Sequence, residues 1–144
     1  MTKKIKILHV FGRMDKGGAE TLVINLLRKI DKNIYQFDFL VHTDKESHYD
    51  KEILELGGRI FSVKSSNRNF LNYRKEVINI LKNNGPYDVI HSHIYNFSGV
   101  FMKIAKQLNI PVRISHSHTV ANKNKSNIIR RFYIRYMRRL ILSY

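Results

Sequence analysis

The chain has 144 residues, 43% of them hydrophobic and 11% aromatic, which predicts one folded globular domain and excludes an intrinsically disordered segment. It contains no cysteine, which excludes disulfides, thiolate nucleophiles and cysteine-ligated zinc and favours a reducing, cytoplasmic setting. It has no apolar run typical of a signal peptide or membrane span, and its formal net charge of +15 predicts an anionic partner.

Strand and helix patterns alternate along the first half of the chain. Residues 4–10 alternate and then become continuously apolar, which predicts a strand covered on both faces. Apolar residues recur at spacings of three and four over residues 19–30, which predicts a helix. Residues 35–42 and 59–63 have strand patterns, and a short helix is expected between them at 49–56, ending at two glycines.

The same alternation continues through the second half. Helices are expected at residues 70–83 and 97–108, and strands at 89–92 and 112–116. A last helix is expected over residues 126–142. Strands that alternate with helices predict a parallel sheet wound by right-handed crossovers. The predicted fold class is therefore α/β, a Rossmann-like parallel sheet with helices on both faces.

Basic and acidic side chains are unevenly distributed. Asp88 is the last carboxylate, so residues 89–144 carry only basic charge. In the expected last helix, apolar side chains fall on one side and four arginines on the other: Arg131, Arg135, Arg138 and Arg139. Two interpretations stay open. This basic amphipathic helix adsorbs to an anionic membrane surface, or its apolar side covers the sheet while the arginines are solvated.

Two adjacent glycines follow the first expected strand. Gly17 and Gly18 stand where the next helix begins, and glycine lets the backbone N–H groups of a helix N-terminus approach a phosphate closely. The dinucleotide-binding pattern Gly-x-Gly-x-x-Gly and the Walker pattern are both absent. The glycines therefore mark either a phosphate-facing turn or a plain turn before a helix.

Five of the seven histidines follow the ends of expected strands: His42, His91, His93, His116 and His118. Ligands of open parallel sheets bind beyond the carboxyl ends of the strands, so these side chains are candidates for one site. The i, i+2 spacing of the last two pairs puts both members on one side of an extended segment. The pairs suit substrate contact, hydrogen bonding within the fold or zinc ligation, although no carboxylate after Asp88 is available to orient a metal-bound imidazole.

Four segments together resemble a known family. They are Lys-Ile-Leu-His-Val-Phe at 6–11, Gly-Gly-Ala-Glu at 17–20, Asp-Val-Ile-His-Ser-His at 88–93 and Pro-Val-Arg-Ile-Ser-His-Ser-His at 111–118. In this order and spacing they resemble the retaining glycosyltransferases of family 4, of the exopolysaccharide type. The resemblance implies the GT-B architecture of two Rossmann-like domains. Residues 1–144 would form the N-terminal, acceptor-side domain, with the C-terminal donor domain absent from this chain.

The resemblance also implies roles for the candidate residues. Gly17 and Gly18 would face the donor phosphate, His116 would be the active-site histidine, and His91, His93 and His118 would line the acceptor side. The reaction would transfer a sugar from a nucleotide-sugar donor to a glycan or lipid-linked acceptor with retention of configuration. It would need no metal or other cofactor and would serve exopolysaccharide or envelope-glycan synthesis, at the cytoplasmic face of a membrane. The isolated chain is expected to be inactive.

Three other functions fit parts of the sequence. A basic nucleic-acid-binding domain would explain the charge of +15, although Phe132, Tyr133 and Tyr136 fall on the apolar side of the last helix, so nucleic acid is not the expected partner. A stand-alone nucleotide-sugar-binding protein would explain the Rossmann-like pattern. Zinc hydrolysis would explain the paired histidines.

Overall fold

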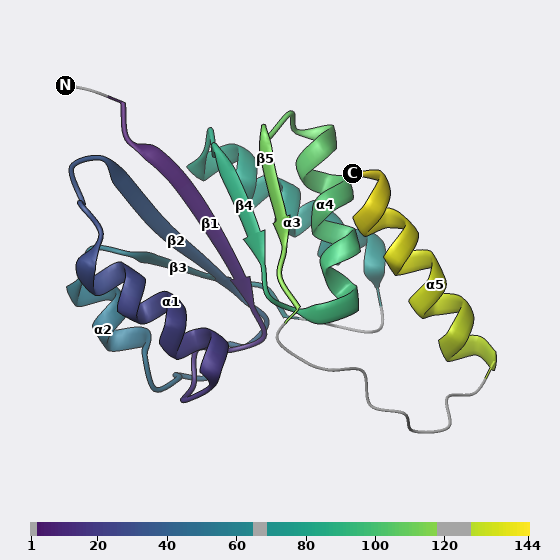
Figure 1. The fold of residues 1–144 in the computed structure, drawn as a ribbon, viewed down its shortest axis with the longest axis horizontal. Helices are drawn as coiled ribbons and strands as arrows, with labels where there is room; N and C mark the ends of the chain where they lie inside the picture. The colour runs from purple at the N-terminus through teal and green to yellow at the C-terminus, as the bar shows by residue number, and fades with distance from the viewer. Residues whose placement is uncertain (1–2, 65–68, 118–127) are drawn as a thin grey trace.

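The fold is that of a computed structural model, which describes residues 3–64, 69–117 and 128–144. Its strands form one parallel sheet in the order β3-β2-β1-β4-β5 (Figure 1). The strands are β1 (Ile5–Phe11), β2 (Tyr35–Val41), β3 (Arg59–Ser62), β4 (Val89–Ser92) and β5 (Val112–Ser115). The helices are α1 (Gly18–Lys29), α2 (Asp50–Glu55), α3 (Phe70–Asn84), the 3₁₀ turn η1 (Tyr95–Phe97), α4 (Ser98–Gln107) and α5 (Ile128–Ser143).

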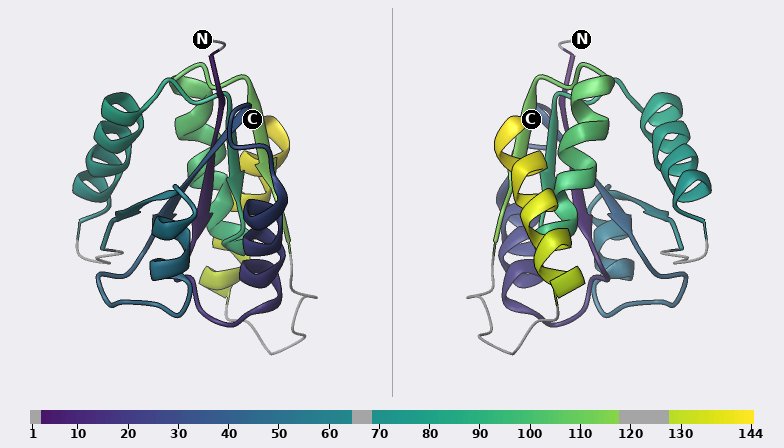
Figure 2. Two further views of the ribbon diagram at one scale, coloured as in Figure 1. Left: turned by 90° about the vertical axis from the view of Figure 1, so that its left-hand side faces the viewer. Right: turned by 90° about the vertical axis from the view of Figure 1, so that its right-hand side faces the viewer.

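Helices cover both faces of the sheet, and each face has its own core (Figure 2). Alternate residues of β1 divide between the two cores, because successive strand side chains point to opposite faces. Leu8 and Val10 pack with α3, α4 and α5, whereas Phe11 packs with α1 and α2. This arrangement confirms the predicted α/β, Rossmann-like fold class.

The predicted elements agree with the observed ones to within a residue or two. The short helix expected at 49–56 spans Asp50–Glu55, and the helix expected at 97–108 is divided into η1 and α4. The last helix begins at Ile128 among the described residues, while positions 126 and 127 lie outside them.

A buried carboxylate links three segments of the sheet. Asp38 of β2 is fully buried and accepts hydrogen bonds from the guanidinium of Arg59 at 3.0 and 2.5 Å and from the Tyr87 hydroxyl at 2.8 Å. Because a buried charge is costly unless it is paired, this network holds β2, β3 and the segment before β4 in register.

Candidate functional site

Four histidines come together at the carboxyl ends of three neighbouring strands. His9 lies near the end of β1, His91 lies in β4, and His93 and His116 follow β4 and β5. The backbone ladder continues past the strand ends, since the N–H of His93 donates to the Val10 carbonyl at 2.9 Å and that of His116 to the Ser92 carbonyl at 2.8 Å. The parallel register therefore brings together residues that lie far apart in the sequence.

The imidazole rings of this group are in contact with one another. The ring centroids of His91 and His93 are 4.0 Å apart, and the His116 ring stacks on His91 at 5.4 Å with 5° between the planes. The His93 ring is also stacked against that of Phe11, with centroids 4.2 Å apart. The structure thus brings His91, His93 and His116 together as the sequence predicted, whereas His118 lies outside the described residues.

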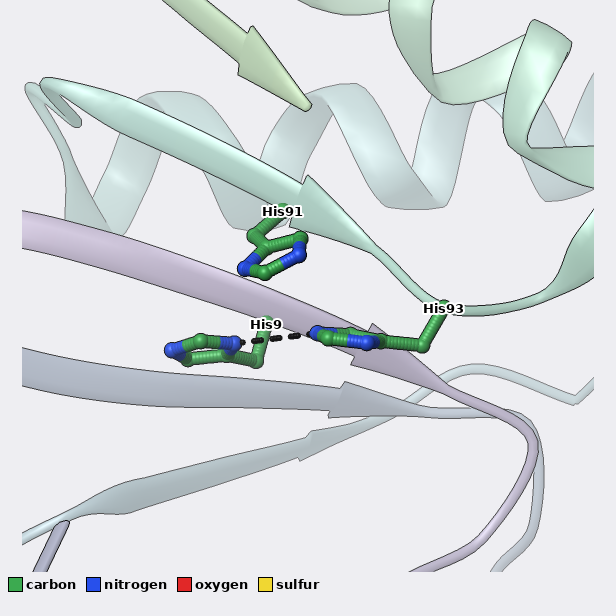
Figure 3. Close-up of side chains that lie close together, drawn as sticks. All are labelled: His9, His91 and His93. Atoms are coloured by element: carbon green, nitrogen blue, oxygen red, sulfur yellow. Dashed lines mark hydrogen bonds between the residues drawn. The ribbon is translucent and has the colours of Figure 1, made fainter. Parts of the chain in front are cut away.

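His9 is a member of the group that the sequence analysis missed. Its side chain is 2% exposed, and its Nδ1 lies 3.3 Å from Nε2 of His93 in a hydrogen bond (Figure 3). Burial, together with the smaller electrostatic effect of the neighbouring His91, lowers the pKa of His9 to about 3, so this imidazole is neutral at neutral pH. The sequence did contain a feature that could have identified His9. It stands two residues before the end of β1, and the alternation of strand side chains puts it on the same side of the strand as Phe11.

His42 belongs to a different environment from the other strand-end histidines. It follows β2 with its side chain toward α3 and α4, where its Nε2 bonds the Tyr73 hydroxyl at 2.8 Å and its ring lies 6.0 Å from that of Phe101. Burial lowers the pKa of His42 to about 4. The prediction that the strand-end histidines form one group is therefore wrong for His42, because the residue after β2 points to the other face of the sheet.

The glycine pair begins α1 as the sequence predicted. Gly17 is the N-cap, with φ −123° and ψ 166°, and α1 starts at Gly18. This conformation is open to any residue, so the glycines are not required by backbone strain. A Cβ on Gly18 would meet nothing within 4 Å, whereas one on Gly17 would overlap the carboxylate of Glu20. The helix N-terminus is thus bare at Gly18 and has an acidic side chain folded over Gly17.

Helix α5 packs only part of its apolar side against the fold, so neither of the two interpretations of this helix is excluded. Met137 and Leu140 are buried against α4, where Gly99 allows close approach: a Cβ there would lie 2.8 Å from the Met137 carbonyl oxygen. Phe132, however, is 66% exposed. Ile128, Ile129 and Tyr136 are also exposed. The four predicted arginines, Arg131, Arg135, Arg138 and Arg139, are exposed as well.

No helix among the described residues is both long enough and apolar enough to cross a membrane.

Comparisons with known proteins agree on one family. The sequence model of Glycosyltransferase Family 4 matches residues 16–144. The chain is 42% identical over 139 residues to EpsF of Bacillus subtilis (strain 168), a glycosyltransferase by name, covering 96% of this chain and 36% of EpsF. It is 29% identical over 133 residues to the capsular polysaccharide biosynthesis glycosyltransferase CapH of Staphylococcus aureus, covering 88% of this chain and 35% of CapH.

A solved structure has a similar fold. It is the crystal structure of Anabaena Alr3699/HepE in complex with UDP, with a TM-score of 0.57 at 14% sequence identity. The match covers 94% of this chain and 35% of that one. The chain therefore spans about a third of the length of each protein that it matches.

Proposed function

Because the chain belongs to Glycosyltransferase Family 4, we propose that it is the acceptor-side domain of a retaining glycosyltransferase. This enzyme moves a sugar from a nucleotide diphosphate donor to a glycan or lipid-linked acceptor. The capsular polysaccharide in the name of the Staphylococcus relative supports a role in exopolysaccharide or envelope-glycan synthesis. The observation that carries the proposal is the group of imidazoles at the strand ends, beside the loop that leads from β1 into α1.

In this proposal, the residues that bind the nucleotide-sugar donor belong mainly to a second domain. The chain spans 36% of EpsF and 35% of CapH, which leaves room in each relative for a further domain of similar or larger size. Residues that select the sugar and the nucleotide lie on that C-terminal domain. The domain described here supplies one wall of the cleft between them and does not transfer sugar alone.

Gly17 and Gly18 contact the donor phosphate across this cleft. The N–H groups at the start of α1 and the helix dipole favour an anion at this position. The Glu20 carboxylate lies over Gly17, so the phosphate displaces a negative charge that the helix N-terminus already attracts. The same N–H groups then stabilise the charge that develops on the departing phosphate.

The histidines meet the sugars on the acceptor side. His116 contacts the reacting centre, and His91, His93 and His118 bind acceptor hydroxyl groups. A neutral imidazole has one donor and one acceptor nitrogen, which suits a hydroxyl that can also do both. Phe11, stacked on His93, holds that ring in place and shields one side of it from water.

Helix α5 holds the domain against the cytoplasmic face of a membrane. Arg131 and Arg135 attract anionic headgroups, and the exposed Phe132 and Ile128 beside them insert at the interface. Arg138 and Arg139 continue the basic side of the helix. This attachment brings a lipid-linked acceptor to the strand ends.

A chimaera tests the proposed function. In it, this chain replaces the matching segment of EpsF, and release of nucleoside diphosphate is measured with a panel of nucleotide sugars and cell-envelope extract as acceptor. We expect the chimaera to use the same sugar nucleotide as EpsF, the product to keep the anomeric configuration of the donor, and the chain alone to release nothing. Turnover by the chain alone, or an inactive but folded chimaera beside an active EpsF, would contradict the proposal.

A further inference from the structure

We propose that His9, His91 and His93 form a binding site for one divalent transition-metal ion such as Zn²⁺. Their rings converge from two neighbouring strands onto one side of the sheet (Figure 3). The sequence pattern suggested zinc ligation only by the pairs His91/His93 and His116/His118, without His9. His91 and His93 are also proposed above to bind the acceptor, so the ion and the acceptor would compete for these two rings, but ion binding can be measured without sugar transfer.

The backbone brings three ligand atoms together. His9 and His91 are register partners in the parallel strands β1 and β4, and His93 lies two residues further along on the same side. One ring nitrogen from each residue lies within 4.8 Å of the other two. Residues on adjacent strands have their positions fixed by the sheet ladder, so the cluster is pre-organised before an ion arrives.

The distances suit a small four-coordinate ion. Zinc–nitrogen bonds of about 2.0–2.1 Å at a tetrahedral angle put two ligand nitrogens about 3.3–3.4 Å apart. Nδ1 of His9 and Nε2 of His93 are 3.3 Å apart. Two ligand nitrogens are therefore already at the spacing that a zinc ion requires. The ion would replace the hydrogen bond between them, and the proton of that bond would move to the other nitrogen of its own ring. A modest ring rotation of His91 supplies the third ligand.

The donor atoms select the class of ion. Three imidazole nitrogens suit Zn²⁺, Co²⁺, Ni²⁺ and Cu²⁺, whereas Mg²⁺ and Ca²⁺ require oxygen ligands.

The surroundings set the expected strength of binding. Metal-bound histidines usually donate their second N–H to a carboxylate or carbonyl, and losing such a partner costs about 10–100-fold in affinity. Nε2 of His9 is buried with no hydrogen-bond partner among the described residues, and the Phe37 ring lies against it with centroids 4.6 Å apart. We therefore expect micromolar rather than nanomolar affinity. Three protein ligands also leave a fourth position open to water.

The test is metal binding by the purified chain. After treatment with a chelator, the protein is titrated with ZnCl₂ by calorimetry and with CoCl₂ by visible absorption, where tetrahedral cobalt gives a characteristic spectrum. We expect one ion per chain and no binding of MgCl₂. His91→Asn and His93→Asn each remove a ligand from a half-buried position and should weaken binding more than about tenfold. His48→Asn, at an exposed histidine outside the cluster, is the matched control.

Circular dichroism and urea unfolding show whether each variant is folded before it is titrated. If His9→Asn does not fold because His9 is buried, the His91 and His93 variants still decide the result. Unchanged binding in both folded variants, equal weakening in His48→Asn, or no cobalt spectrum with the wild-type chain would overturn the proposal.

Discussion

Mild acid should destabilise the domain because His9 and His42 are buried in the neutral form and bind a proton only when the chain unfolds. Burial lowers the pKa of His9 to about 3 and that of His42 to about 4, from an ordinary value of 6.5. Between the lowered pKa of each histidine in the folded chain and the ordinary value of 6.5, the unfolded chain binds more protons than the folded one, so stability falls as the pH falls. The contribution of each neutral histidine is complete above 6.5 and is lost as the pH falls from 6.5 toward 4 and 3.

The size of the effect follows from the two shifts. A pH of about 5 lies roughly 1.5 units below the pKa of 6.5 in the unfolded chain and above the pKa values of both histidines in the folded chain. Each pH unit in this range changes the free energy of unfolding by about 1.36 kcal/mol per histidine. Each histidine therefore lowers the free energy of unfolding by about 2 kcal/mol, and the two together by about 4 kcal/mol. A domain of this size has a total stability of about 5–15 kcal/mol, so the loss is large.

Urea unfolding followed by circular dichroism from about pH 7.5 to about pH 5 measures this loss. His42→Gln puts a non-titrating amide near the Tyr73 hydroxyl, which His42 Nε2 bonds at 2.8 Å, and should reduce the acid sensitivity by about 2 kcal/mol. His48→Asn is the exposed control and should behave as the wild type. If His42→Gln loses as much stability as the wild-type chain over this range, the assignment of the acid sensitivity to His42 is refuted.

Three further variants test the packing of α5, the network around Asp38 and the basic helix. Gly99→Ala puts a Cβ 2.8 Å from the Met137 carbonyl oxygen, so we expect the free energy of unfolding in urea to drop by about 1–3 kcal/mol; wild-type stability would show that α5 does not pack as described. Asp38→Asn removes the charge that pairs with a guanidinium and should cost about 1–3 kcal/mol in the same assay, and no loss would mean that the network is dispensable. The double substitution of Arg131 and Arg135 by Gln should weaken co-sedimentation with anionic vesicles roughly 30-fold, at about 1 kcal/mol per arginine, and leave neutral vesicles unaffected. Equal binding of the double variant and the wild type to anionic vesicles would refute the membrane contact.

The helices and strands were predictable from sequence because their signals are local. The spacing of apolar residues over 19–30 and the alternation of apolar and polar residues over 35–42 indicate which side of each element is buried. Gly17 and Gly18 also mark the start of α1 without any knowledge of the rest of the fold. The fold class followed from the order of these elements.

Which histidines come together depends on the order of the strands in the sheet, and local sequence patterns do not specify that order. β1 and β4 are neighbours although more than seventy residues separate them, and only this neighbourhood brings His9 to His91. The same is true of Asp38, whose partner Arg59 lies on the adjacent strand β3. The apolar pattern of α5 likewise left open whether this side packs on the fold or faces a membrane, whereas the structure shows that α4 covers only the part around Met137 and leaves Phe132 exposed.

The most direct measurement of the central claim is the turnover of the EpsF chimaera with His116 replaced by Gln. His116 is proposed to contact the reacting centre, and removing a group that stabilises the transition state typically costs about 100-fold or more in kcat. We predict a loss of that size, with the urea midpoint unchanged and full activity in His48→Asn. Wild-type turnover in the folded His116→Gln chimaera would contradict the assignment of the strand-end histidines to a glycosyltransferase site.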